Sequence, residues 1–256
     1  MVLTNRTILI TGASSGIGRA VAVALARRRN NLIVTARRQA LLESLQQEVE
    51  SAGSQCLAIA CDALDEVESS TVVRLGVERF GRIDCALLNI GHGPPLNMAK
   101  VNVSDVRGNM RVNYDTMVNY LIPLVEVMKR QRDGVIAHTN SLAGFLGLPM
   151  QGPYCAAKAA GRILFDACRL ELKAYNIRFC ALHPGFVHTE AVANDGIPAP
   201  FEISPEQAAS CIIRGIEKEK RDYLFPFALR WLTRVGRILP KPLTGFLLSK
   251  AAPDDY

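Results

Sequence analysis

Aromatic residues are scarce in this chain: they make up 6% of its 256 residues and include a single tryptophan. Apolar residues nonetheless reach 49% and charged residues 21%, so the core must be built mainly from Ala, Val, Ile and Leu. Aliphatic side chains of this kind fill the buried strands of parallel sheets. The length fits one α/β domain or two small ones.

The seven cysteines lack the spacing of a metal site. No two of them form a Cys-x-x-Cys pair, and the four histidines form no cluster with them, so we expect no metal site. Most of the cysteines lie in apolar segments, which is typical of small buried side chains in a reducing compartment. The apolar run at Thr7 begins so early that we expect no signal peptide and a cytoplasmic protein.

Acidic residues are absent from the first 42 positions, which contain seven arginines, and the whole chain has a net charge of +6. A positive field of this kind attracts anions, and nucleic acid is one candidate partner. We favour a phosphorylated cofactor and expect no nucleic acid, because a candidate phosphate-binding turn lies in the same segment.

That turn runs from Thr11 to Gly18, between an apolar run and a helical pattern, and its glycines follow the spacing Gly-x-x-x-Gly-x-Gly. Glycine lets the backbone turn sharply and lets a phosphate come close, and the free N–H groups and dipole of the following helix attract it. An ordinary strand-to-helix turn is the alternative. The residues expected at the cofactor here are Gly12, Ser14, Ser15, Gly16, Ile17 and Gly18.

Apolar runs and helical patterns alternate along the rest of the chain. Expected strands cover 7–10, 31–36, 55–61, 83–88, 135–139, 177–182 and 223–225, and later helices cover 37–50, 65–80, 104–129, 152–175 and 204–220. This alternation implies a parallel sheet with helices on both faces. Ligands of such sheets bind beyond the carboxyl ends of the strands. The candidates at those ends are Gly12, Arg37, Asp62, Asn89, Ser141, Pro184 and Gly185.

The end of the second strand lacks the carboxylate that usually binds a ribose 2′-hydroxyl. Thr35 and Ala36 stand there, and Arg37 and Arg38 follow. Two guanidinium groups can bind a 2′-phosphate, and cations at a helix start oppose the helix dipole unless an anion lies nearby. The pattern favours NADP over NAD, with two solvated arginines as the alternative.

Tyr154 and Lys158 are four residues apart at the start of a helical pattern, so they share one helix face. A phenol has a reference pKa of about 10, and we expect the Lys158 ammonium to lower the pKa of Tyr154 for acid–base chemistry. Ser141 follows the fifth strand at the same sheet edge and can hydrogen-bond a substrate oxygen. An exposed helix pair is the usual origin of this spacing, but Ser141 and the glycine turn argue against it.

From about residue 6 to 225 the chain resembles the short-chain dehydrogenase/reductase family. The glycine turn matches the family's Thr-Gly-x-x-x-Gly-x-Gly motif, while its Asn-Asn-Ala-Gly motif survives here only as Asn89 and Gly91. The resemblance implies an α/β, Rossmann-type doubly wound parallel sheet of about seven strands in a single domain. It implies catalytic roles for Asn113, Ser141, Tyr154 and Lys158, and cofactor contacts from Arg37, Asp62, Ala63, Asn89, Gly91, Tyr154, Lys158, Pro184, Gly185, Val187 and Thr189.

The resemblance also implies a mechanism. Hydride would pass between a nicotinamide and a carbonyl or secondary alcohol, with Tyr154 as general acid or base and Ser141 polarising the carbonyl. Lys158 would lower the pKa of Tyr154 and hold the nicotinamide ribose, and Asn113 would hold a water on the proton path. Family members form homodimers or homotetramers, here through residues 104–129 and 152–175.

Two regions bear on the substrate. The segments 142–153 and 186–203 are mostly apolar, so we expect a lipophilic carbonyl or alcohol. Beyond the catalytic domain at 1–225, residues 226–256 form a basic amphipathic extension on or near the substrate side. Its part up to Lys250 holds five cations and no acid. We favour a lid or subunit contact for it, and membrane-surface contact through 226–250 is the second interpretation.

Two other functions fit parts of the pattern. A non-catalytic dinucleotide sensor or scaffold would share the fold, but it would not need Ser141, Tyr154 and Lys158. An epimerase or dehydratase of nucleotide sugars shares the Tyr-x-x-x-Lys spacing. The short chain has no room for the sugar-binding domain of such an enzyme.

Overall fold

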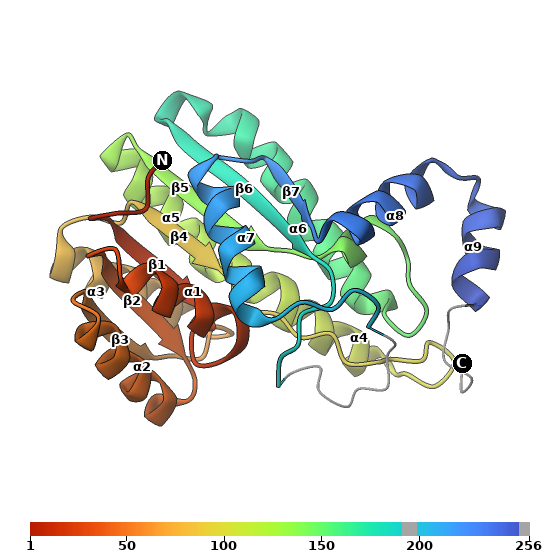
Figure 1. Ribbon diagram of the computed structural model, residues 1–256, viewed down its shortest axis with the longest axis horizontal. Helices are drawn as coiled ribbons and strands as arrows, with labels where there is room; N and C mark the ends of the chain where they lie inside the picture. Colours follow the sequence, from red (N-terminus) through yellow and green to blue (C-terminus); the bar gives the residue numbers. More distant parts are fainter. Residues whose placement is uncertain (191–198, 251–256) are drawn as a thin grey trace.

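The computed structural model describes residues 1–190 and 199–250. In these residues the strands form one seven-stranded sheet in the order β3-β2-β1-β4-β5-β6-β7, and every pairing is parallel (Figure 1). The predicted doubly wound parallel sheet of about seven strands is therefore confirmed. The strands are β1 (Thr7–Thr11), β2 (Asn31–Ala36), β3 (Gln55–Ala60), β4 (Cys85–Leu88), β5 (Gly134–Thr139), β6 (Ile177–Pro184) and β7 (Asp222–Phe225).

Helices cover both faces of this sheet. They are α1 (Gly16–Ala26), α2 (Gln39–Ser51), α3 (Glu66–Phe80), α4 (Val103–Met110), α5 (Thr116–Gln131), α6 (Gly152–Glu171), α7 (Pro205–Glu217), α8 (Phe227–Ile238) and α9 (Lys241–Lys250). Short turns of other types are η1 (Arg111–Asp115), η2 (Leu142–Phe145) and η3 (Lys173–Tyr175). No helix of the described residues is both long and apolar enough to cross a membrane.

Two apolar cores lie on opposite faces of the sheet. Side chains alternate along β1, so Ile8 and Ile10 pack with α1, α2 and α7, whereas Leu9 packs with α3, α5 and α6. Because both faces are covered, the central strands are apolar throughout, as expected of a parallel sheet. This arrangement brings the carboxyl ends of all seven strands to one edge.

The single helix predicted over 104–129 is divided in the structure. α4 and α5 are separated by η1, a π-helical turn. There the side chain of Asn113 turns inward, and its Nδ2 donates to the carbonyl of Asn109, 3.0 Å away. Hydrophobic periodicity could not reveal this turn, since one turn of wider backbone barely changes the pattern of apolar residues. Such turns are frequent at functional sites.

The predicted start of α7 is confirmed. The hydroxyl of Ser204 accepts a hydrogen bond from the backbone N–H of Gln207, and the side chain of Gln207 returns one to the Ser204 N–H. This reciprocal cap, with Pro205 at the first position, satisfies N–H groups that a helix start leaves free. α7 therefore begins at a defined point close to the glycine turn, where Pro205 lines a pocket with Gly16.

Candidate active site

The glycine turn between β1 and α1 is as tight as the sequence predicted. Gly12 and Gly16 have φ angles of +64° and +54°, in the left-handed region that glycine adopts freely. A Cβ on Gly18 would lie 2.3 Å from the carbonyl oxygen of Gly12. No acidic residue lies in the first turn of α1, and Ser15 at its N-cap makes no side-chain capping bond. The first N–H groups of the helix are thus available to an anion.

Arg38, the N-cap residue of α2, lies across this turn. One of its guanidinium nitrogens donates to the hydroxyls of Ser14 and Ser15, at 3.1 and 2.6 Å. Another pairs with the carboxylate of Glu190 at 3.3 Å. Arg37 is exposed and makes no hydrogen bond or ion pair with any described residue. The structure therefore distinguishes the two arginines, because only the guanidinium of Arg38 contacts the serines of the turn.

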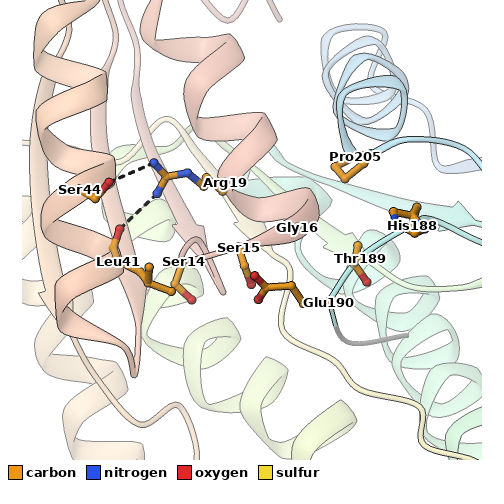
Figure 2. A pocket seen from close by; sticks show the side chains of 10 residues that line it. All are labelled: Ser14, Ser15, Gly16, Arg19, Leu41, Ser44, His188, Thr189, Glu190 and Pro205. Atoms are coloured by element: carbon orange, nitrogen blue, oxygen red, sulfur yellow. Dashed lines mark hydrogen bonds between the residues drawn. The ribbon is translucent and has the colours of Figure 1, made fainter. Parts of the chain in front are cut away.

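A pocket of about 520 Å³ opens beside the turn. Figure 2 shows Ser14, Ser15 and Gly16 on one side and Thr189 and Glu190, from the segment after β6, on the other. A Cβ on Gly16 would lie 3.1 Å from the side chain of Thr189. The pocket covers the phosphate-binding turn but does not extend to the predicted catalytic residues. These lie after β5 (Ser141), in α6 (Tyr154 and Lys158) and in η1 (Asn113).

Asn89 joins three strand ends at this edge. Its backbone N–H donates to the hydroxyl of Thr11 at 2.9 Å, and its side-chain oxygen accepts from the hydroxyl of Thr139 at 2.8 Å. A Cβ on Gly18 would lie 2.9 Å from its side-chain nitrogen. Asn89 therefore fixes the end of β4 against β1, β5 and the glycine turn, although the neighbouring motif positions differ from the family pattern.

Tyr154, Lys158 and Ser141 converge as predicted. The Ser141 side chain lies near Tyr154 and favours its phenolate form, while the Ser141 hydroxyl accepts a hydrogen bond from the backbone N–H of Ala143 at 3.1 Å. The ammonium of Lys158 lies 5.6 Å from the centre of the Tyr154 ring. Lys158 is only 2% exposed, and its Nζ donates to the carbonyl of Thr139 at 3.0 Å. A phenol, an ammonium and a hydroxyl are thus held together beyond the end of β5.

The predicted lowering of the pKa of Tyr154 was wrong for this structure. Burial raises the pKa of Tyr154 to about 12, and the neighbouring Ser141 side chain opposes only part of that rise. Burial also lowers the pKa of Lys158, to about 8. The ammonium of Lys158 donates to the carbonyl of Thr139 rather than to the phenol oxygen. Desolvation is therefore the largest cause of the pKa shift of both groups.

The loop after β4 lies against this group. A Cβ on Gly91 would lie 2.7 Å from Nζ of Lys158 and 2.9 Å from Oδ1 of Asn113. A Cβ on Gly93 would lie 3.1 Å from the ring of Tyr154. Asn113 holds the loop, because its amide donates to the carbonyl of His92 at 2.7 Å and its oxygen accepts from the His92 N–H at 3.0 Å. Asn113 thus lies beside Lys158, and its predicted water stays a prediction.

Sequence reasoning missed Asn140, which couples the catalytic residues. Its side-chain oxygen accepts from the backbone N–H of Ser141 at 2.7 Å, and its amide donates to the carbonyl of Lys158 at 2.9 Å. Asn140 is buried and therefore sets the distance between the end of β5 and helix α6. The signal was its place next to Ser141, but an asparagine there is also typical of a turn.

The buried His183 and the exposed Asp222 form a second support that was not predicted as part of the site. Nε2 of His183 lies 2.8 Å from the Asp222 carboxylate, and Nδ1 lies 3.3 Å from the carbonyl of Ser141. Burial lowers the pKa of His183, and the carboxylate of Asp222 partly opposes this. The pair links β6 and β7 to the backbone of Ser141.

The remaining predicted cofactor residues lie at the same edge. Asp62 is exposed, and its side chain accepts from the N–H of Leu64 at 3.1 Å, while Ala63 is buried beside it. Pro184 ends β6, and Val187 pairs with Ile203. Part of the predicted substrate segment 186–203 and the last six residues of 226–256 lie outside the described residues. Contacts of these residues with a cofactor stay predictions.

Residues 6–197 match the family described as short chain dehydrogenase. The chain belongs to the short-chain dehydrogenase family. It is 30% identical to an uncharacterized oxidoreductase of Myxococcus xanthus, over 94% of this chain and 95% of that one. It is 34% identical to the A-factor type gamma-butyrolactone 1′-reductase (1S-forming) of Streptomyces virginiae, over 75% and 76% of the two chains.

Solved structures agree with this short-chain dehydrogenase assignment. The alcohol dehydrogenase of the archaeon Thermococcus sibiricus, solved with 5-hydroxy-NADP, is 26% identical and superimposes with a TM-score of 0.77, covering 86% of this chain and 94% of that one. The protein is accordingly an oxidoreductase that acts on CH–OH or C=O groups with a nicotinamide cofactor.

Proposed function

We propose that this short-chain dehydrogenase uses NADP(H) and acts on a lipophilic carbonyl compound or secondary alcohol. The observation that carries the cofactor choice is the guanidinium of Arg38, which lies on the hydroxyls of Ser14 and Ser15. One cation from the start of α2 and two hydroxyls from the turn after β1 suit a 2′-phosphate, and no carboxylate directly follows β2 to bind a free 2′-hydroxyl.

The residues present fit a dinucleotide. A side chain at Gly18 would clash with the carbonyl oxygen of Gly12, so glycine is required there for the backbone of the turn to stay tight. A tight turn at a helix start is the form of backbone that binds a pyrophosphate. When bound, the cofactor supplies or accepts the hydride. The chain itself must hold the substrate and move one proton.

Tyr154 is the group that moves this proton. Its hydroxyl donates a proton to the carbonyl oxygen in reduction, and its phenolate accepts the proton of the alcohol in oxidation. Ser141, which lies near Tyr154, positions the same substrate oxygen. Lys158, whose ammonium lies 5.6 Å from the centre of the Tyr154 ring, would hold the hydroxyls of the nicotinamide ribose.

A lipophilic substrate is supported by the surroundings of Ser141. Leu142 and Phe145 in η2 follow it directly, and Gly185 after β6 lies against Leu142 and against Leu229 of α8. The reductase among the relatives supports a carbonyl substrate. We also place the protein in the cytoplasm, because all seven cysteines are free thiols.

The cofactor proposal is tested by calorimetric titration of NADPH and NADH into the wild type, Arg38→Gln and Arg37→Gln. The two variants lose the same charge from neighbouring positions. Arg38 is 49% exposed, so we expect the lower range for a charge-assisted hydrogen bond, about 1.5–2 kcal/mol, or a 10- to 30-fold weaker affinity for NADPH. NADH binding should change little. Equal losses in both variants would contradict the assignment to Arg38.

The chemistry is tested separately with Tyr154→Phe. This variant should bind NADPH as the wild type does but should not oxidise it with any member of a panel of ketones and aldehydes. A sensor or scaffold would instead bind NADPH and leave the whole panel unreduced in the wild type as well.

We also propose a homo-oligomer built through α5 and α6. Ile122, Ile163 and Leu170 on these helices are exposed, and apolar side chains of this size are suited to burial between subunits. Sedimentation velocity of the wild type and of Ile163→Asp tests this: the variant should shift toward the monomer.

A further inference from the structure

Helices α8 and α9 extend from the body of the molecule beyond β7 and α6, in blue in Figure 1. The inner side of α8 is well packed: Leu229 and Thr233 are buried, and the guanidinium of Arg237 lies 4.8 Å from the centre of the Phe145 ring. α9 is tied to α8 by a hydrogen bond from the hydroxyl of Thr244 to the carbonyl of Gly236, 3.2 Å long. α8 is therefore fixed to the body of the protein, and α9 is fixed to α8.

The outer side of these helices is apolar. Ile238 is 85% exposed, Phe227 71% and the only tryptophan, Trp231, 48%. Eight of the seventeen large apolar side chains that are exposed among the described residues lie within 226–250, a tenth of the chain. Such a concentration is not the ordinary scatter of apolar residues on a surface. The eight are Phe227, Trp231, Leu232, Val235, Ile238, Leu243, Phe246 and Leu247.

Cations adjoin this apolar surface. Arg230, Arg234 and Arg237 repeat at spacings of four and three residues, so they form a stripe along α8 beside the apolar one. Lys241 and Lys250 add two charges on α9, and 226–250 contains no acid. The acids that follow, Asp254 and Asp255, leave residues 226–256 with three positive charges in excess.

Charge decides among the occupants of this surface. A second copy of the chain would bring the same cations together across a two-fold axis, and like charges at an interface oppose association. A lid would turn its apolar side inward, whereas here that side is exposed. A bilayer with anionic lipids matches both features, because its headgroup boundary accepts apolar side chains and its phosphates attract arginine.

We infer that α8 and α9 dock this protein on an anionic membrane surface, with the apolar side chains of α8 at the headgroup boundary and Arg230 and Arg234 on lipid phosphates. The opposite side of α8 packs on Phe145, four residues after Ser141, and on Gly185. Docking therefore brings the substrate side of the site close to the lipid. Delivery of a lipophilic substrate from the bilayer rests on the proposed function, whereas docking itself does not.

Trp231 reports docking directly, since it is the only tryptophan. With the full chain and vesicles of phosphatidylcholine plus phosphatidylglycerol, we expect a blue shift of its emission and co-sedimentation. Vesicles of phosphatidylcholine alone, or inorganic phosphate at the same ionic strength, should produce neither. Equal binding to both kinds of vesicle, or no binding to either, would overturn the inference.

Matched variants distinguish binding through α8 from nonspecific binding of the protein to vesicles. Arg234→Gln should weaken binding to the anionic vesicles about fivefold, as expected for one cation at the surface, whereas Arg27→Gln, an exposed position at the C-cap of α1, should not. Ile238→Ser should also weaken binding, but Leu170→Ser on α6 should not. Equal effects in each pair contradict the inference, as does a change of oligomeric state in Ile238→Ser without any change in vesicle binding.

Failure of docking and failure of the proposed function have different signatures. Tyr154→Phe should dock as the wild type does, and Arg234→Gln should keep the wild-type affinity for NADPH and the wild-type rate with a water-soluble ketone. Loss of the vesicle signal with normal NADPH binding removes docking alone.

Discussion

Replacing Lys158 with methionine should make the protein more stable while abolishing its activity. Lys158 is 2% exposed, and burial lowers the pKa of its ammonium from 10.5 to about 8. At pH 7 the folded protein therefore holds a charge that the surroundings disfavour. Methionine has a similar length and no charge, so it removes this cost. Active sites often sacrifice stability in this way.

The magnitude follows from the pKa. A difference of about 2.5 pKa units corresponds to roughly 3 kcal/mol at pH 7. The variant also loses the bond from Nζ to the Thr139 carbonyl, which contributes about 1 kcal/mol. The free energy of unfolding should thus rise by about 2 kcal/mol in the variant, measured by urea denaturation at pH 7.

The pH dependence gives an independent check. The pKa of Lys158 is lower in the folded protein than in the unfolded chain, so between about pH 8 and 10.5 the unfolded chain binds the proton more strongly. As the pH rises through this range, wild-type stability therefore increases by up to about 1.4 kcal/mol per pH unit from this group. Subtracting the Lys158→Met curve removes the other titrating groups. A variant that is less stable than the wild type at pH 7, or a flat difference curve, would refute the reasoning.

Three further predictions concern buried groups. Gly18→Ala should lose about 1–3 kcal/mol of stability and bind NADPH poorly, whereas Gly108→Ala, in open space on α4, should gain about 0.5–1 kcal/mol; urea denaturation distinguishes them. Burial lowers the pKa of His138 well below its ordinary value. Stability should therefore fall as the pH drops below about 6.5, and more steeply in the wild type than in His138→Leu; equal slopes would count against this. Asn140→Ala removes the side chain that links the Ser141 N–H to the Lys158 carbonyl. It should lower kcat more than the affinity for NADPH, and an unchanged kcat would exclude a positioning role.

Much of the site followed from local sequence patterns. Parallel strands alternating with helices bring all strand ends to one edge, so Gly12, Asn89 and Ser141 could be placed together without a structure. The glycine turn was equally predictable, because positive φ angles and close backbone approach both require glycine. The helix start at Ser204 followed from its capping residues.

Tertiary structure decided what depends on distances between remote segments and on burial. Sequence placed Arg37 and Arg38 together, but only packing of α2 against the turn assigned the serine contacts to Arg38. The direction of the pKa of Tyr154 depended on how deeply α6 is buried, which a four-residue spacing does not report.

The same division holds for α8. Its amphipathic pattern was evident from Arg230, Arg234 and Arg237, because helical periodicity is a local property. Which side would face the protein was not, since that is decided by shape and charge on a surface formed from Phe145 and Gly185, residues far away in the chain. The sequence by itself determined that α8 has an apolar side, and the tertiary structure left that side outward.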